Sequence, residues 1–442
     1  MAAMIFEQLI YSDLGCAAYV IGCQGTGEAV VVDPALDTRP LERALEHHRA
    51  RLVGVIETHT HADHISGHGI LALELGVPVY VSALAGADHP HTPLADGDSI
   101  RTGNIEIVAM HTPGHRPEHL ALQVIDHTRA DEPWLLLTGD SLFVGDVARP
   151  DLAVAGEEGA AGLYRTLHER ILQLPDGVEV FPGHVAGSLC GKGMSAKPST
   201  TLGFERRFND MLQPMGEEAF VAAANAGLAP KPPNLARIVD TNRGPFVARP
   251  RPPERLAGLP DDAPLLDVRS TADAVHGLAR GAWHVPVAQT GFGTRAGFLL
   301  DPDDPVVLIA DDEAQALQAA RQLQAIGHFT QRGWFPAAEV RDLVQLPPLT
   351  LDEFLAERGD LQIVDVRTED ELPLPLDGAR QIPLHDLHLA GLEGLDPAHP
   401  TAVICQSSQR AGIGAAILAR RGFADVRPVL GGGMGSAPLQ TG

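Results

Sequence analysis

Short apolar runs that end in turns dominate the N-terminal part of the chain. Apolar or alternating runs of this length, bounded by Gly, Pro or Asp, are typical of strands. Longer stretches with apolar residues on one stripe are typical of helices. The pattern predicts strands at 5–11, 17–23, 29–32, 52–56, 105–110, 134–137 and 178–181, and helices at 39–51, 65–75, 160–174 and 203–227. This alternation indicates an α/β fold.

Histidine and aspartate side chains follow several of these strands. Imidazole and carboxylate groups are the ligands of zinc, iron and manganese, and His-x-His lets two rings converge on one ion from a loop. The sequence therefore predicts a metal site where the strands end. Its candidates are His59, His61, Asp63 and His64 after the run 52–56, then His115, Asp140 and His184 after three later strands.

Prolines cluster between residues 243 and 260, which is typical of a linker. Beyond it the chain repeats itself, and two related copies predict a duplicated α/β domain. The matching segments are 265–269 with 363–367, 281–286 with 378–383, and 307–309 with 402–404. The domains expected are therefore residues 1–245, 255–345 and 346–442.

In the second copy, the apolar run 402–404 leads into Cys405, and a helix follows. A cysteine at a strand-to-helix turn faces free backbone N–H groups and the helix dipole, which favour a thiolate. Arg410 adds a permanent cation beside the loop. Because a thiolate is a nucleophile, this loop predicts a site that accepts and passes on sulfur.

The first copy lacks this chemistry. Counting back from Gly327, as Cys405 is counted back from Gly422, places Ala310 at the thiol position and Gln315 at the arginine position. Asp311 and Asp312 would also repel an anionic sulfur group. We expect a catalytically inactive spacer or docking domain.

Composition narrows the function classes. The formal net charge is −24, which argues against binding to nucleic acid or to an anionic membrane surface. No apolar stretch is long enough for a membrane helix, and the N-terminus shows no signal-peptide pattern. The cysteines are Cys16, Cys23, Cys190 and Cys405, without a C-x-x-C pair, so a reducing compartment such as the cytoplasm is expected.

The spacing His59-x-His61-x-Asp63-His64, followed by single His, Asp and His residues, resembles the metallo-β-lactamase fold superfamily over residues 4–245. The resemblance implies an αβ/βα sandwich with the metal at one edge of two packed sheets. Residues 255–442 resemble the rhodanese family, whose active loops resemble Cys-x-Ser-Gly-x-Arg. Ser408 stands here where that family usually has Gly.

Members of the first family follow two chemistries. Some are two-metal hydrolases similar to glyoxalase II, and others are mononuclear iron persulfide dioxygenases. On the second pattern, one Fe(II) per chain would be held by His59, His115 and Asp140. Spacing alone leaves both open, because the ligands for a second ion are still present. These are His61, Asp63, His64 and His184.

Two features favour the dioxygenase. The runs 140–151, which contains Gly145-Asp146-Val147-Ala148-Arg149-Pro150-Asp151, and 184–192 look like that branch. A persulfide-oxidising domain and a persulfide-handling domain also share an intermediate. The resemblance implies Arg149 and Cys190 as substrate contacts, a thiol persulfide and O2 as substrates, sulfite and thiosulfate as sulfur partners, and a homo-oligomer. Alternatives are a zinc thioester hydrolase with a rhodanese tail and a persulfide sensor or carrier without turnover.

Overall fold

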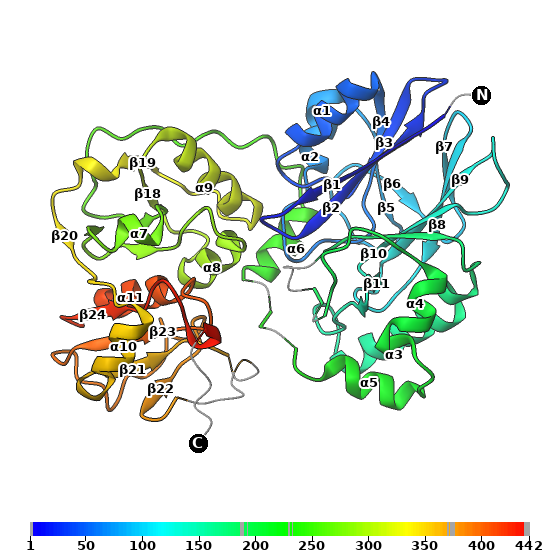
Figure 1. Ribbon diagram of the computed structural model, residues 1–442. Coiled ribbons are helices and arrows are strands. Elements are labelled where there is room, and N and C mark those ends of the chain that lie inside the picture. Colours follow the sequence, from blue (N-terminus) through cyan, green and yellow to red (C-terminus); the bar gives the residue numbers. More distant parts are fainter. Residues whose placement is uncertain are drawn as a thin grey trace. The chain divides into compact units, whose positions relative to one another are not determined.

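The computed structural model describes residues 3–185, 190–191, 193–228, 230–231, 233–368, 371 and 376–436. The chain divides into two compact units (Figure 1). The first comprises residues 1–250 and the short segment 324–327, and the second comprises residues 251–323 and 328–442. The boundary at residue 250 lies within the proline-rich segment.

The first unit contains two six-stranded mixed sheets. One has the order β1-β2-β3-β4-β5-β6, antiparallel up to β3 and parallel from β3 onward. The other has the order β14-β13-β10-β9-β8-β7, in which only β10 and β13 are parallel. The strands are β1 (Met4–Tyr11), β2 (Cys16–Cys23), β3 (Glu28–Val32), β4 (Arg51–Ile56), β5 (Val79–Ser82), β6 (Thr92–Leu94), β7 (Ser99–Thr102), β8 (Ile105–His111), β9 (Leu120–Asp126), β10 (Leu135–Gly139), β13 (Glu179–Pro182) and β14 (Thr200–Thr201), with a small hairpin of β11 (Leu142–Phe143) and β12 (Asp146–Val147).

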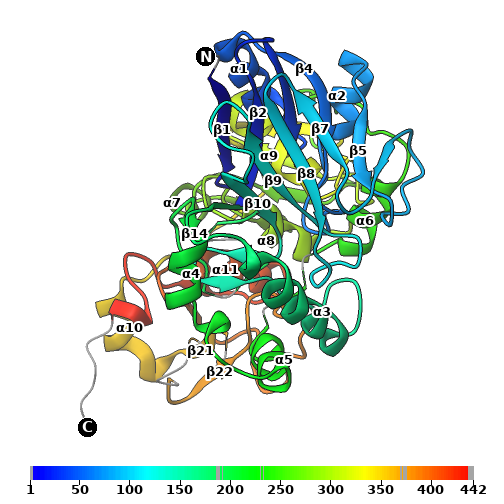
Figure 2. The same cartoon turned by 90° about the vertical axis from the view of Figure 1, so that its right-hand side faces the viewer.

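Apolar side chains fill the space between the two sheets, and helices cover their outer faces. Tyr19 and Val32 of the first sheet pack with Ile107 and Leu122 of the second. Helices α1 and α2 lie on the first sheet, and α3 and α5 on the second (Figures 1 and 2). This is the αβ/βα sandwich expected from the sequence. The helices are α1 (Arg39–His48), α2 (His68–Leu75), α3 (Gly156–Glu169), α4 (Leu202–Phe208), α5 (Glu217–Asn225) and α6 (Leu235–Arg243).

The prediction of a single helix over 203–227 is wrong. The structure has α4, a short 3-10 turn at Asp210–Leu212, and then α5. The Asn209 side chain accepts a hydrogen bond from the backbone N–H of Met211 and caps the turn. Pro214 and Gly216 follow, and neither favours a helix interior, so a new helix begins at Glu217.

The second unit contains two four-stranded parallel sheets with matching topology, β17-β15-β18-β19 and β22-β21-β23-β24. We call the halves that carry these sheets the first repeat (255–345) and the second repeat (346–442). The strands are β15 (Leu265–Asp267), β16 (Leu278–Ala279), β17 (Trp283–His284), β18 (Val307–Ala310), β19 (Gly333–Pro336), β20 (Leu343–Val344), β21 (Gln362–Asp365), β22 (Ala379–Gln381), β23 (Thr401–Ile404) and β24 (Val426–Pro428). The helices are α7 (Thr271–Ala274), α8 (Phe292–Leu299), α9 (Glu313–Ala325), α10 (Leu351–Glu357) and α11 (Ala411–Arg420).

The repeats agree in side-chain detail and share one core. Asp267 binds the guanidinium of Arg269 in the first repeat, and Asp365 binds that of Arg367 in the second. One apolar cluster contains buried residues of both repeats, including Cys405. Within the described ranges, no helix is long and apolar enough to cross a membrane.

Candidate metal centre and sulfur loop

The predicted metal ligands lie on loops that follow β4, β8, β10 and β13. Backbone hydrogen bonds connect these loops, because Leu120 N donates to Thr58 O at 2.7 Å and Gly183 N donates to Gly139 O at 2.8 Å. The loops therefore approach one another at one edge of the sandwich, as the positions of the strand ends suggested.

Three of the predicted ligands converge. The nearest ligand atoms of His59, His115 and Asp140 all lie within 4.8 Å of one another, and all three residues are buried. His115 Nε2 is 3.5 Å and His59 Nε2 is 4.0 Å from Asp140 Oδ2. Within the part of the chain that the structure describes, His59 Nε2 and Asp140 Oδ2 have no hydrogen-bond partner. Since buried polar atoms without a partner are costly, their convergence is consistent with a bound metal ion.

The remaining polar atoms of these three side chains are held by neighbours. His59 Nδ1 is 2.9 Å from Thr58 Oγ1, whose hydroxyl donates to Asp33 Oδ2 at 2.7 Å. His115 Nδ1 donates to the carbonyl of Arg149 at 3.0 Å. These contacts place the proton on Nδ1 and leave Nε2 free as a ligand atom.

Burial also fits this donor set. It lowers the pKa of His59 and of His115, so both rings are neutral, as a metal ligand requires. Burial alone would raise the pKa of Asp140, but the charge of His184 lowers it well below its usual range. The centre therefore offers two neutral imidazoles and one carboxylate.

Of the candidates for a second ion, His184, Asp63 and His64 are linked by hydrogen bonds, and the ligand atoms of His61, Asp63 and His64 lie within 4.8 Å of one another. His184 Nδ1 is 2.7 Å from Asp140 Oδ1, and His184 Nε2 is 2.8 Å from Asp63 Oδ2. Asp63 Oδ1 is in turn 3.1 Å from His64 Nδ1. Both ring nitrogens of His184 are thus engaged by carboxylates. Near His61, the carboxylates of Glu57 and Asp33 lie 3.2 Å and 3.4 Å from Nε2.

Arg149 and Cys190, the predicted substrate contacts, are both buried. The Arg149 guanidinium donates to both oxygens of Asp151, at 2.8 Å and 3.0 Å. The Cys190 thiol lies within 4.8 Å of ligand atoms of His184 and Asp63, and burial raises its pKa to about 12. Of the run 184–192, residues 186–189 and 192 lie outside the described residues. All four cysteines are free thiols.

Sequence reasoning missed several residues around the centre. His119 Nε2 accepts a hydrogen bond from the backbone N–H of Asp140 at 2.9 Å. Its Nδ1 is 2.8 Å from Thr112 Oγ1. Thr58 and Asp33, described above, were also missed. These residues lie beside the strands that carry the candidate ligands, and that position was the available sequence signal. No sequence motif marks them.

Cys405 lies directly after β23, as predicted, and is buried. The segment after β24 closes over it, because Met434 N donates to the carbonyl of Cys405 at 3.0 Å. A Cβ atom on Gly433 would lie 2.4 Å from the same carbonyl oxygen. The backbone at Gly433 therefore has room only for glycine.

Ser408 takes the backbone conformation that glycine favours, with φ = +69°. Its hydroxyl donates to the carbonyl of Gly432 at 2.5 Å and accepts from the N–H of the same residue at 2.9 Å. These two hydrogen bonds offset the cost of a left-handed residue, and the loop keeps its turn despite the substitution noted in the sequence.

Arg410 stands beside the loop but is paired. Its guanidinium donates to the two carboxylate oxygens of Glu371 at 2.7 Å and 2.5 Å. Burial raises the pKa of Glu371. The hydrogen bonds from Arg410 and Thr368 lower this pKa by more than burial raises it, so that it falls to about 2. Glu371, which the sequence did not single out, therefore neutralises the cation predicted to favour the thiolate.

Residues 11–184 match the metallo-beta-lactamase superfamily, and residues 350–435 match the rhodanese-like domain, which covers the second repeat alone. The mitochondrial persulfide dioxygenase of Homo sapiens is 32% identical over 244 residues, which cover 54% of this chain and 88% of the human protein. The Mus musculus protein is 30% identical over the same shares.

Among solved structures, the chain is similar to the crystal structure of a metallo-beta-lactamase from Staphylococcus aureus. It is 31% identical, with a TM-score of 0.69, and the alignment covers 76% of this chain and 98% of that one. Because the first unit makes up less than 76% of the chain, the match extends beyond that unit.

Proposed function

Because the chain belongs to the metallo-beta-lactamase superfamily and carries a C-terminal rhodanese-like domain, we propose that it is an iron-dependent persulfide dioxygenase coupled to sulfur transfer. The substrate is a low-molecular-weight thiol persulfide such as glutathione persulfide. Persulfide, O2 and water give thiol, sulfite and two protons. The observation that carries the proposal is the convergence of His59, His115 and Asp140 in a chain related to a persulfide dioxygenase.

Two imidazoles and one carboxylate are the ligand set typical of non-haem Fe(II) oxygenases. Ferrous iron, when bound, supplies redox chemistry with oxygen. The chain's own residues orient its ligands: Thr58 and the carbonyl of Arg149 fix the two rings, and His184 holds the carboxylate. Arg149 also remains our candidate for holding the anionic persulfide, and Cys190 for contacting it.

We propose one metal ion per chain, and we keep a second ion at His61, Asp63 and His64, whose ligand atoms also lie within 4.8 Å of one another, as the dinuclear alternative. A ring nitrogen that shares a proton with a carboxylate has no lone pair to offer a metal, and both nitrogens of His184 are hydrogen-bonded in this way. The dinuclear alternative, a zinc thioester hydrolase, would require these hydrogen bonds to break.

In the sulfur-transfer step, the Cys405 thiolate attacks the outer sulfur of thiosulfate. A sulfur–sulfur bond forms at Cys405, the sulfur–sulfur bond of thiosulfate breaks, and its electron pair leaves with sulfite. The reverse step joins a Cys405 persulfide to sulfite. We propose residues 1–245 as the dioxygenase domain, 346–442 as the active rhodanese domain and 255–345 as a rhodanese-like domain without the thiol.

The test is oxygen uptake by Fe(II)-loaded protein given glutathione persulfide, with C405S alongside. Persulfide-dependent uptake that survives C405S, together with lost transfer from thiosulfate, supports both assignments. Two bound zinc ions and thioester cleavage without oxygen uptake would favour the hydrolase. Persulfidation of Cys405 without oxygen uptake would favour a sensor or carrier.

A further inference from the structure

The sulfur site needs a cation that is free to bind an anion. Thiosulfate and sulfite are dianions, and Cys405 reacts as an anion, so the reacting groups repel one another. Arg410 is occupied by both oxygens of Glu371. A second positive group near Cys405 would therefore have a clear role.

Arg295 is such a group, and it comes from the first repeat. It lies on α8, where Phe292, Ala296 and Leu299 are buried in the same apolar cluster as Cys405. The next turn of α8 also reaches the second repeat, because the ring centroids of Phe298 and His385 are 6.0 Å apart.

Contact at the start of α11 brings the repeats together beside the sulfur loop. A Cβ atom on Gly412, the second residue of α11, would lie 2.2 Å from the Thr271 side chain of the first repeat. The helix that follows the Cys405 loop therefore packs against the first repeat at its N-terminal end.

The Arg295 side chain is partly buried, and it interacts electrostatically with both Cys405 and Arg410. Burial, and then the like charge of Arg410, lower its pKa. Its Nη1 donates to the neutral amide oxygen of Gln289 at 3.1 Å. Among the described residues, no carboxylate lies within ion-pairing distance of it. Its other N–H donors can therefore serve a ligand.

We propose that Arg295 binds the sulfonate oxygens of thiosulfate, and sulfite itself, so that the first repeat completes the substrate site of the second. This inference rests on the proposed sulfur transfer at Cys405. Arg295 holds the oxygens while the Cys405 thiolate attacks the outer sulfur, and it stays with sulfite as that group departs. A planar guanidinium suits a tetrahedral oxyanion because it offers paired donors.

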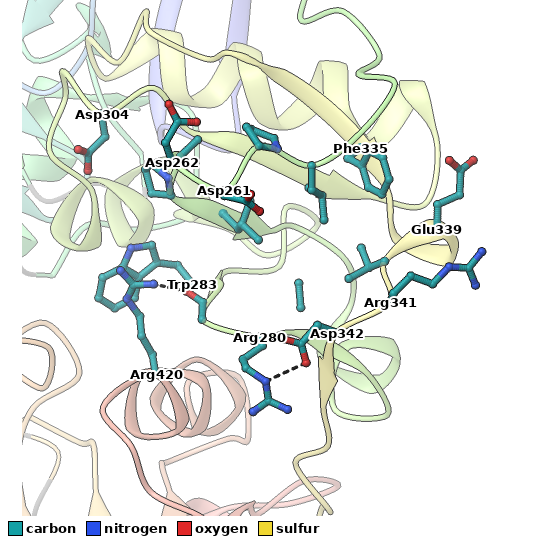
Figure 3. A pocket seen from close by; sticks show the side chains of 18 of the residues that line it. Asp261, Asp262, Arg280, Trp283, Asp304, Phe335, Glu339, Arg341, Asp342 and Arg420 are labelled. Carbon is teal, nitrogen blue, oxygen red and sulfur yellow. Dashed lines mark hydrogen bonds and ion pairs between the residues drawn. The ribbon is translucent and has the colours of Figure 1, made fainter.

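The first repeat also provides a matched control. Arg280 lines a cavity of about 840 Å³ that also contacts Trp283 and Arg420 (Figure 3). Arg420 is the last residue of α11, a helix about 15 Å long, whereas Cys405 lies on the loop before its first residue, so the cavity lies at the far end of the helix from that loop. Arg280 is exposed and pairs with Asp342 at 2.8 Å. Replacing it removes an arginine of the same repeat without affecting the sulfur loop.

The experiment measures thiosulfate-dependent sulfur transfer to cyanide by the full chain as wild type, R295M, R295K and R280M. We expect R295M to raise the KM for thiosulfate about 10- to 100-fold, the usual effect of losing a hydrogen bond to a charged group. Its kcat should change much less. Inhibition by sulfite should weaken in parallel, which a purely structural role for Arg295 would not produce. R280M should match the wild type.

A KM for R295M that stays within about twofold of the wild type would overturn the assignment. If R295M lowers the unfolding midpoint, R295K decides: a smaller rise in KM than in R295M supports charge recognition, and an equal rise overturns it. A wild-type protein that transfers no sulfur from thiosulfate would overturn the proposed sulfur transfer itself, and this assignment with it.

Discussion

Replacing Thr58 with valine tests whether the contact behind His59 prepares the metal centre. The Thr58 hydroxyl donates to Asp33 and accepts from His59 Nδ1, and Thr58 is buried. Valine has nearly the same shape but cannot form either hydrogen bond. His59 Nδ1–H and one oxygen of Asp33 would then be left without these partners.

A buried donor without a partner costs about 1–3 kcal/mol. The ring can avoid part of this cost by moving its proton to Nε2, but that removes the lone pair from the predicted ligand atom. Binding a metal would then have to restore the unfavourable tautomer. We expect T58V to weaken Fe(II) binding about 10- to 100-fold, as losses of such supporting contacts usually do.

The assay is anaerobic titration of Fe(II) against a competing chelator, with persulfide-dependent oxygen uptake measured on the same samples. T58S keeps the hydroxyl and should bind Fe(II) nearly as well as the wild type. T102V is a control, because Thr102 is equally buried but its hydroxyl has no hydrogen-bond partner among the residues that the structure describes. A T58V protein whose affinity stays within about twofold of the wild type would refute the tautomer argument.

Three further changes concern the sulfur loop. E371Q should lower the urea midpoint at pH 7. The pKa of Glu371 in the folded protein is lowered to about 2, so the stabilisation by its carboxylate is present above the unfolded pKa and is lost as the pH falls. The difference in urea midpoint between E371Q and the wild type should therefore shrink below about pH 4. An equal difference at pH 3 would contradict the pairing with Arg410. S408A should destabilise the folded protein by about 1–2 kcal/mol, because it removes the two hydrogen bonds of the hydroxyl. S408G should destabilise it less, because glycine adopts the left-handed backbone conformation without strain. The reverse order of urea midpoints would show that the hydroxyl contributes little. G433A should abolish sulfur transfer without affecting oxygen uptake, because the added Cβ would collide with the Cys405 carbonyl. The control is G359A, where an added Cβ would contact no other atom. Full sulfur transfer by G433A would contradict the prediction.

The convergence of the candidate metal ligands was predictable from the sequence because these residues share one local rule. Each follows a strand, and strands bring their ends to a common edge, so His59, His115 and Asp140 could be placed together without coordinates. Thr58 and His119 could not, because a threonine before a histidine, or a histidine after Pro-Glu, acquires its role only through a tertiary contact. Glu371 and Arg295 are harder still, since they lie far from Cys405 in the sequence.

The fold was predicted in outline for a similar reason. Apolar periodicity located the principal strands, and the internal repeat anticipated two sheets of the same order. The apolar periodicity gave a wrong prediction over 203–227, because Asn209, Pro214 and Gly216 interrupt the helix that this periodicity would extend. Local capping and turn residues carried more weight there than the apolar stripe.

The shared apolar core of the two repeats has a consequence for cooperativity. Leu308 of the first repeat and Val403 of the second belong to one cluster, as do Ala296 and Ala411. Cutting the chain near residue 346 would open this buried surface to water on both fragments. We therefore expect the halves to melt in a single transition when intact and to aggregate when expressed apart, even though each carries a complete sheet.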